Sequence, residues 1–182
     1  MENGNKQIFD QNNLKGLSYS FANWNNLLHE SKAIIVENLS TALANQDYPF
    51  YEGDSKAVLV YKGKAENVAL LSDLTGWTDP IFFNPLQGTD LFYLILEIEP
   101  DARIQYLLMI DGNAIVDTAN KFKSLHGLGA MSELAMPKYE RHPYLNDFLY
   151  GREGSYNGLL KHSLPPGSLP YIHEVHIYLP PD

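Results

Sequence analysis

The serines, histidines and carboxylates of the sequence are the residues that could carry hydrolytic or metal-dependent chemistry. An α/β-type serine hydrolase places its nucleophile in Gly-x-Ser-x-Gly. No serine of this chain has that setting, and in GSYNG (residues 154–158) the serine directly follows the first glycine. His173 and His176 lie in HEVH, which lacks the two-residue spacer of the HExxH zinc motif. Residues three apart on a strand point to opposite faces, so these histidines are not expected to share a metal.

The carboxylates give no clear candidate for a catalytic or metal site, and cysteine is absent from the chain. Asp111 and Asp117 flank a turn in IDGNAIVD, where Asp-Gly is typical of a hairpin, and no further oxygen ligands follow at the alternating positions of a calcium loop. The absence of cysteine excludes disulfides, thiolate zinc sites and cysteine nucleophiles. We therefore predict no catalytic residue, no metal site and no cofactor within this chain.

The charge balance limits the classes of partner. The formal net charge is −9, and the 13 basic residues are scattered, whereas nucleic-acid binding needs clustered Lys and Arg. No stretch approaches the roughly 20 apolar residues of a membrane span. The start, MENGNKQIFDQNN, lacks the basic region and apolar run of a secretory signal. We expect a cytoplasmic protein that binds neither nucleic acid nor membrane.

Helical periodicity is confined to the N-terminal part. The 182 residues are 45% hydrophobic and suffice for one domain with a substantial core. Within residues 20–45 the apolar positions fall at helical spacing. Ser20 and Ser31 are plausible N-caps, which predicts two consecutive helices or one kinked helix. Residues 47–54, DYPFYEGD, are predicted to form a connecting loop.

The pattern then changes to the alternation of strands, which predicts a mainly β, antiparallel sandwich. The predicted strands are residues 56–63, 66–73, 91–98 and 103–110, with shorter ones at 114–117 and 132–136. Residues 137–168 are rich in Gly, Pro, Tyr and polar residues, without a sustained period, which is typical of a linker or extended arm. Strand character returns at residues 171–179.

Five stretches follow one another in a recognisable order. They are VLVYKG, VALLSDLTGW, TDLFYLILEIEPDARIQYLLMIDG, the aspartate of IVDTAN, and LGAMSELAMPKYER. In this order, residues 58–139 resemble the N-terminal early-set immunoglobulin-like domain that precedes the catalytic domain of enterochelin-esterase-like esterases. That domain is related to the glycogen-binding modules of branching enzymes.

The resemblance implies a division of the chain and a role for it. Residues 1–50 would be an N-terminal helical segment, 51–140 the immunoglobulin-like β-sandwich and 141–170 a linker. Residues 171–182, which include HIYLPPD, resemble the first strand of a hydrolase domain that would continue beyond Asp182. The chain would then be a non-catalytic accessory domain of a serine esterase.

The same resemblance suggests the partners. The accessory domain would shape the mouth of the active site or an oligomer interface. Its partner would be the C-terminal α/β-hydrolase domain of the same protein, and a homodimer is the other possibility. The aromatic loop KYERHPYLNDFLYG (residues 138–151) is the contact surface we expect.

Trp77 is the one candidate ligand-binding residue, and it defines an alternative function. In the glycogen-binding relatives, the Trp at this turn stacks on a sugar ring and acts with a second Trp, a Lys and an Asn. The corresponding positions of this sequence hold Ala114, Leu107 and Met131. The chain would therefore be an α-glucan-binding module only if Trp77 stacks on sugar without these partners. Otherwise Trp77 packs as a residue of the sandwich corner.

A third possibility is a free-standing structural or interaction protein. In that case residues 171–179 would be paired within the sandwich as an ordinary edge strand, for which terminal prolines are acceptable.

Overall fold

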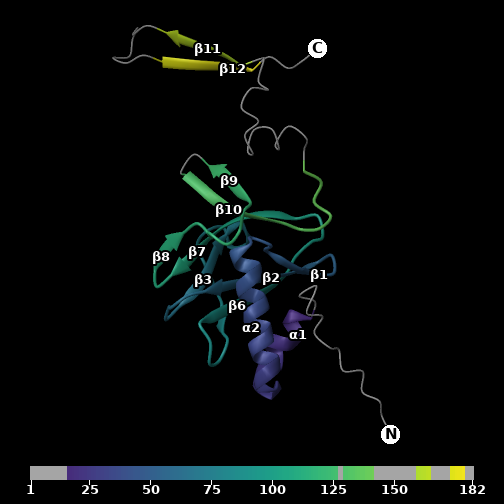
Figure 1. Ribbon diagram of the computed structural model, residues 1–182. Helices are drawn as coiled ribbons and strands as arrows, with labels where there is room; N and C mark the ends of the chain where they lie inside the picture. The colour runs from purple at the N-terminus through teal and green to yellow at the C-terminus, as the bar shows by residue number, and fades with distance from the viewer. Residues whose placement is uncertain (1–15, 127–128, 142–158, 165–172, 179–182) are drawn as a thin grey trace. The chain divides into compact units, whose positions relative to one another are not determined.

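The computed structural model describes residues 16–126, 129–141, 159–164 and 173–178 (Figure 1). The chain divides into two compact units, Met1–Glu140 and Arg141–Asp182. The first unit contains the helices and a β-sandwich, and the second contains a hairpin. The mainly β fold with an N-terminal helical segment is confirmed.

The first unit begins with a helical layer, made of α1 (Leu17–Ala22), the 3₁₀ turn η1 (Trp24–Asn26) and α2 (His29–Ala44). The prediction of consecutive helices is confirmed, but Ser20 and Ser31 are not their N-caps. The helices begin earlier, after Gly16 and Leu28.

The cap of α1 comes from a distant strand. Glu52 accepts the backbone N–H of Ser18 at 2.9 Å through Oε1 and the Ser18 hydroxyl through Oε2. This carboxylate satisfies a free N–H of the first turn, as a local N-cap would. Because the cap lies 34 residues away, no local sequence pattern could have identified it.

Two antiparallel sheets form the sandwich. The four-stranded sheet has the order β1 (Phe50–Glu52), β2 (Lys56–Lys62), β6 (Leu91–Glu97) and β5 (Asn84–Pro85). The six-stranded sheet has the order β4 (Ile81–Phe82), β3 (Val68–Ser72), β7 (Arg103–Ile110), β10 (Gly129–Ala135) and β9 (Lys123–His126), and β8 (Asn113–Ile115) also pairs with β7.

All six predicted strands of the sandwich are present, whereas four short ones were not predicted. These four are β1, β4, β5 and β9, none longer than four residues. A run of two to four residues carries too little alternation to be recognised in a sequence. β1 lies within the predicted loop at residues 47–54.

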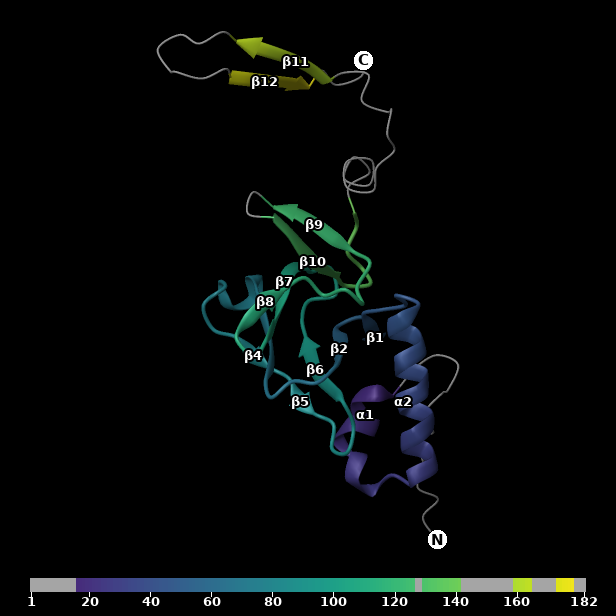
Figure 2. The same cartoon turned by 60° about the vertical axis from the view of Figure 1, so that its left-hand side comes forward.

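The four-stranded sheet is buried on both faces. In β2, Ala57, Val58, Leu59 and Val60 are all 1% exposed or less. The helical layer covers the face of the sheet on which Val60 lies. Tyr93 is opposite Val60 on this face, and the centre of the Tyr93 ring is 4.5 Å from that of Phe21 in α1. Figure 2 shows α1 and α2 on this side of the sandwich.

The other face of the four-stranded sheet meets the six-stranded sheet and forms the main core. Cross-strand pairs of leucines supply it, Leu59 opposite Leu94 and Leu70 opposite Leu108, all 6% exposed or less. Side chains on one face of a sheet alternate along each strand. The layers are therefore helices, four-stranded sheet and six-stranded sheet.

The second unit contains a hairpin of β11 (Leu159–Leu164) and β12 (His173–Tyr178), paired antiparallel from Leu159 opposite Tyr178 to Leu164 opposite His173. β12 matches the strand predicted at residues 171–179. β11 lies inside the predicted linker, where no strand was expected. The two strands form a sheet of their own.

The helical layer should contribute to the stability of the sandwich. Leu39 of α2 is 0% exposed and belongs to the core, so Leu39→Ala is expected to lower the free energy of unfolding by about 2–5 kcal/mol. Urea denaturation followed by circular dichroism measures this. Ile34, on the same helix but 37% exposed, is the matched control, and Ile34→Ala should change stability by about 0.5 kcal/mol or less. Equal effects of the two changes would show that α2 is not part of the core.

Candidate functional site

Trp77 lies at the corner between β3 and β4, directly after the 3₁₀ turn η2 (Asp73–Thr75). Gly76 and Trp77 both have left-handed backbone conformations, with φ of 59° and 65°. The indole Nε1 of Trp77 donates to Asp73 Oδ1 at 2.9 Å, and the other oxygen of Asp73 accepts the N–H of Gln105 at 2.8 Å. The half-buried Trp77 ring is therefore tied, through one carboxylate, to β7 of the six-stranded sheet.

The three positions that would complete a sugar site lie on the same sheet but are apolar. Leu107 is on β7 opposite Leu71, Ala114 is on β8 opposite Met109, and Met131 is on β10. None of these side chains can hydrogen-bond a sugar hydroxyl. A sugar stacked on Trp77 would receive no polar support from them.

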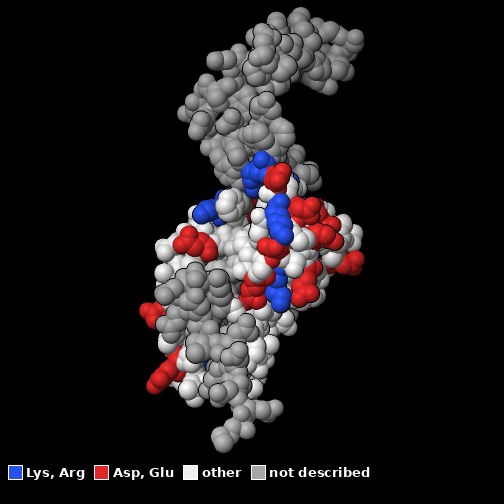
Figure 3. Space-filling model, turned by 90° about the vertical axis from the view of Figure 1, so that its right-hand side faces the viewer, with Lys and Arg blue, Asp and Glu red and all other residues white. Residues whose placement is uncertain are grey.

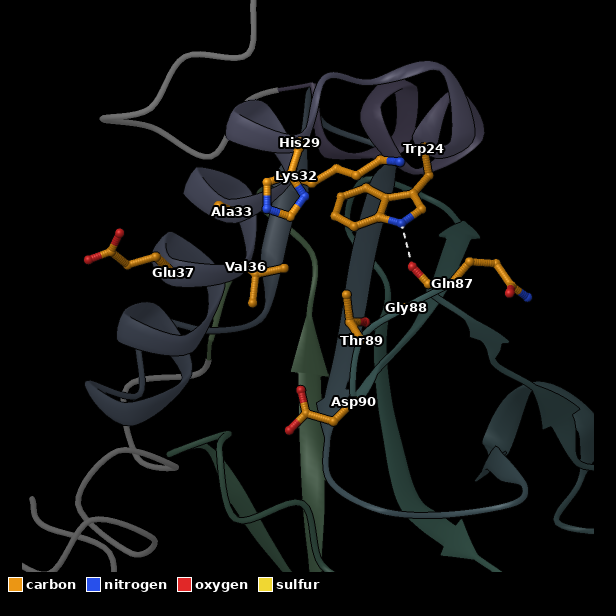
Figure 4. A pocket seen from close by; sticks show the side chains of 10 residues that line it. All are labelled: Trp24, His29, Lys32, Ala33, Val36, Glu37, Gln87, Gly88, Thr89 and Asp90. Atoms are coloured by element: carbon orange, nitrogen blue, oxygen red, sulfur yellow. Dashed lines mark hydrogen bonds between the residues drawn. The ribbon is translucent and has the colours of Figure 1, made fainter.

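A groove of about 880 Å³ lies between the helical layer and the β5–β6 turn (Figure 4). It is lined by Trp24, His29, Lys32, Ala33, Val36, Glu37, Gln87, Gly88, Thr89 and Asp90. The indole of Trp24 forms one wall and donates from Nε1 to the Gln87 carbonyl at 2.9 Å. In the sequence, Trp24 is recognisable only as one of the apolar positions at helical spacing within residues 20–45.

Two polar side chains of this groove, those of Lys32 and Thr89, make contacts that support the fold. Lys32 places its ammonium 5.6 Å from the centre of the Trp24 ring, in a cation–π arrangement. The Thr89 hydroxyl donates to the Leu86 carbonyl at 2.7 Å and holds the turn. No group of three or more potential metal ligands occurs among the described residues. The groove therefore lies where the helical layer meets the turn before β6, and the hydrogen bond from Trp24 to the Gln87 carbonyl joins the two.

Asp117, considered in the sequence as a turn residue and as the aspartate of the IVDTAN stretch, is buried beside the inward-facing Tyr106 and is 3% exposed. Its Oδ2 accepts the hydroxyl of Tyr106 at 2.8 Å, and its Oδ1 accepts the N–H of Ala119 at 3.0 Å. Asn120 donates from Nδ2 to the same Tyr106 hydroxyl at 3.0 Å and to the Glu133 carbonyl at 2.7 Å. These bonds join the loop after β8 to the strands β7 and β10.

Burial dominates the electrostatics of this network. It raises the pKa of Asp117, although the hydrogen bonds from Tyr106 and Ala119 act in the opposite direction. It also raises the pKa of Tyr106 and of Tyr48, whose hydroxyl accepts the N–H of Val60 at 3.1 Å. Both carboxylate oxygens of Asp117 accept hydrogen bonds from protein groups, so Asp117 holds the loop after β8 against β7.

A second buried acid lies on β10. Glu133 is 0% exposed and forms an ion pair with Arg103 of β7, whose Nε is 2.8 Å from Oε2. Gln105 and Ser124 extend this polar cluster along the same face of the six-stranded sheet. Glu133 was not predicted as a buried acid, although a lone acid within the apolar stretch MSELAM was a signal.

Charged side chains of both signs are mixed on the surface. Figure 3 shows basic side chains among acidic ones on one face of the molecule. Two exposed pairs contribute, Lys56 with Glu97 and Lys138 with Asp54. None of the described helices has the length and apolarity required to cross a membrane. The contact loop predicted at residues 138–151 lies almost entirely outside the described residues.

Comparison with known proteins identifies the fold. No protein-family model and no curated protein matches the sequence. Among solved structures, enterobactin esterase from Shigella flexneri in the presence of enterobactin has a TM-score of 0.54 at 16% identity, over 72% of this chain and 42% of that one. Ferric enterobactin esterase from Salmonella typhimurium has a TM-score of 0.54 at 17% identity, over 71% and 42%. Enterochelin esterase from Shigella flexneri has a TM-score of 0.50 at 14% identity, over 74% and 43%.

These matches show a shared fold. The chain spans less than half the length of the esterases that it matches. The relation to enterochelin esterases that the sequence suggested is thus supported at the level of fold, while the early-set domain type remains a prediction.

Asp117 should make stability depend on pH in a defined direction. Because its pKa is higher in the folded chain than the value of about 3.9 expected when unfolded, the folded state binds the proton more tightly. The contribution of Asp117 to stability therefore falls as pH rises from about 4 through the raised pKa. In Asp117→Asn this titration is absent, so the free energy of unfolding, variant minus wild type, should become more positive with rising pH.

Urea titrations across this pH range measure the difference. Asp79→Asn, at an exposed carboxylate, controls for the loss of one negative charge. If the free energy of unfolding of Asp117→Asn minus that of the wild type stays constant or falls with rising pH, the burial of this carboxyl group is contradicted.

The two tryptophans should differ in their accessibility. Trp24 is 4% exposed and Trp77 is half-buried, and they are the only tryptophans. Trp77→Phe should therefore leave fluorescence that acrylamide quenches weakly, whereas Trp24→Phe should leave the more readily quenched emission. Because Leu107, Ala114 and Met131 offer sugars no hydrogen bonds, we expect a linear α-glucan to leave the emission of the wild type unchanged. A glucan-dependent change that disappears in Trp77→Phe would instead favour the carbohydrate-binding alternative.

Proposed function

We propose that this chain is a non-catalytic accessory domain, of the early-set immunoglobulin-like type, of a cytoplasmic serine esterase related to the enterochelin esterases. The observation that carries the proposal is the fold match, which includes about 71% of this chain but only about 42% of each esterase. The order of sequence stretches in residues 58–139 supports the same relation. The remaining part of such an esterase would hold the catalytic domain.

Three serine hydroxyls of the first unit are engaged by other protein groups, which supports a structural role for these serines. The hydroxyl of Ser18 is engaged by Glu52, that of Ser20 donates to the Gly16 carbonyl, and that of Ser132 accepts the Asp117 N–H. A catalytic serine instead needs a hydroxyl that is free to attack, a histidine in contact and an oxyanion hole. These serines serve the fold.

The parent reaction would be hydrolysis of an ester through an acyl-enzyme. In that reaction a serine hydroxyl attacks the ester carbonyl, the alcohol leaves, and water then cleaves the acyl group from the serine. The accessory domain would contribute to the mouth of the active site or to a subunit interface. It would not take part in bond breaking.

The test is a comparison of this 182-residue chain with the natural gene product. We expect the reading frame to continue beyond codon 182 and to include a Gly-x-Ser-x-Gly sequence. A fluorophosphonate probe should label that serine in the longer protein, which should also hydrolyse 4-nitrophenyl butyrate. Replacement of the labelled serine by alanine is the control for both readouts.

Three results would overturn the proposal. They are a stop codon directly after Asp182, a longer protein without a probe-reactive serine, and labelling of the 182-residue chain itself.

A further inference from the structure

The outer face of the six-stranded sheet is the side of the sandwich that has no helix among the described residues. The helical layer packs on the four-stranded sheet, as Figures 1 and 2 both show. An antiparallel sheet with one solvated face normally alternates apolar residues inward and polar residues outward. The outward residues of the six-stranded sheet follow this rule over only half of its length.

β7 shows the change within one strand. Its inward residues Ile104, Tyr106 and Leu108 are buried. Its outward residues are polar at first, with Arg103 and Gln105 in the cluster around Glu133, and then apolar, with Leu107 and Met109.

The neighbouring strands extend the apolar half into a surface. The register places Phe82, Ala69, Met109 and Ala114 in one row across β4, β3, β7 and β8. Leu71 and Leu107 lie opposite each other in the next row. We call the set Leu71, Phe82, Leu107, Met109 and Ala114 the apolar face.

The apolar face is accessible. Phe82 is 58% exposed, Ala114 is exposed, and Leu71, Leu107 and Met109 are half-buried. Leu74, in the adjoining turn η2, is 41% exposed. A contiguous exposed apolar surface of this kind is typical of an interaction site.

The charges around the apolar face limit the partner. Six exposed acids lie in the loops at the two ends of β3 and β7, against one base, Lys64. The acids are Glu66, Asp73, Asp79, Glu99, Asp101 and Asp111. A second copy of this chain, docked face to face, would bring these acids against their own equivalents, and like charges across an interface are unfavourable. Lysine and arginine around an apolar centre would be complementary.

We infer that the apolar face docks against the catalytic domain of the proposed esterase, through an apolar patch bordered by Lys and Arg. This inference rests on the proposed function. More than half of each matched esterase chain lies outside the shared region, so a partner large enough to cover a sheet face exists in those proteins. The surface is distinct from the contact loop expected at residues 138–151.

Hydroxyl-radical footprinting of the proposed full-length esterase, called the longer protein below, and of the 182-residue chain tests the docking. Oxidation of methionine follows its exposure. Met136, 2% exposed, supplies the buried reference. In the longer protein, oxidation of Met109 should fall to the level of Met136, and that of Phe82 should fall with it. Leu28, 74% exposed on the helical layer, should be oxidised equally in both.

A pair of variants provides a second readout on the same proteins. Phe82→Glu should lower the melting temperature of the longer protein but leave that of the 182-residue chain nearly unchanged. Leu28→Glu, the same change at an exposed apolar residue away from the apolar face, should change neither. Added salt should weaken the docking, because it screens the charges of the rim.

The outcomes separate this inference from the proposed function. If the longer protein carries a fluorophosphonate-reactive serine but Phe82 and Met109 stay as reactive as in the 182-residue chain, the docking inference is wrong and the esterase proposal stands. A reading frame that ends after Asp182 overturns both. Protection of Phe82 by a linear α-glucan in the 182-residue chain would assign the face to carbohydrate instead.

Discussion

The burial of β2 on both of its faces is the constraint on which the rest of the first unit depends. Residues 57–60 are four consecutive apolar residues, each 1% exposed or less. A strand buried in this way needs an apolar layer on each side. The six-stranded sheet supplies one layer, and the helical layer supplies the other. The helices are therefore an integral third layer, and Glu52 fixes α1 to β1 at its first turn.

Polar groups inside the sandwich are arranged around the same strand. β1 pairs only with residues 56–58 of β2, so the N–H of Val60 has no partner on β1. The Tyr48 hydroxyl accepts this N–H instead. Asp117, Tyr106 and Asn120 then join the loop after β8 to the core strands. A buried polar group without a partner costs about 1–3 kcal/mol. The network meets this requirement and fixes the path of the loop, which gives Asp117 a structural role at this position.

The sequence predicted the elements whose pattern is long and local. The six longer strands and the consecutive helices follow from alternation or helical spacing over several residues. The predicted N-caps were wrong. Glu52, 34 residues away, caps α1, and α2 begins after Leu28, whose side chain makes no capping hydrogen bond. The short strands and β11 were missed because their pairing partners, rather than their own residues, make them strands.

The candidate site was accessible to sequence reasoning in part. The sequence predicted Trp77 as a candidate ligand residue, and that remains a prediction. The structure places Leu107, Ala114 and Met131, the positions expected to complete the site, on the same sheet. The apolar face was not recognised, because it joins four strands whose order and register only the structure supplies. Leu107 and Met109 alone are indistinguishable in sequence from core residues of β7. Glu133 was missed for the corresponding reason, since its counter-ion Arg103 lies 30 residues away.

The short outer strands of the sandwich have a consequence for its behaviour during synthesis. Among the described residues of the first unit, the strands at the sheet edges are β1, β5, β4, β8 and β9, with two to four residues each, and β5 contains Pro85. Long unpaired edges are templates on which other chains add as new strands and grow into amyloid. In the part of the unit that the structure describes, the short strands pair with two or three residues of each of β2, β3 and β6. They divide the edges of both sheets, so the unpaired runs that remain on these strands have four residues or fewer and are short templates for edge-to-edge growth. Association of this unit would then use the faces of its sheets, where the side chains determine which partner binds.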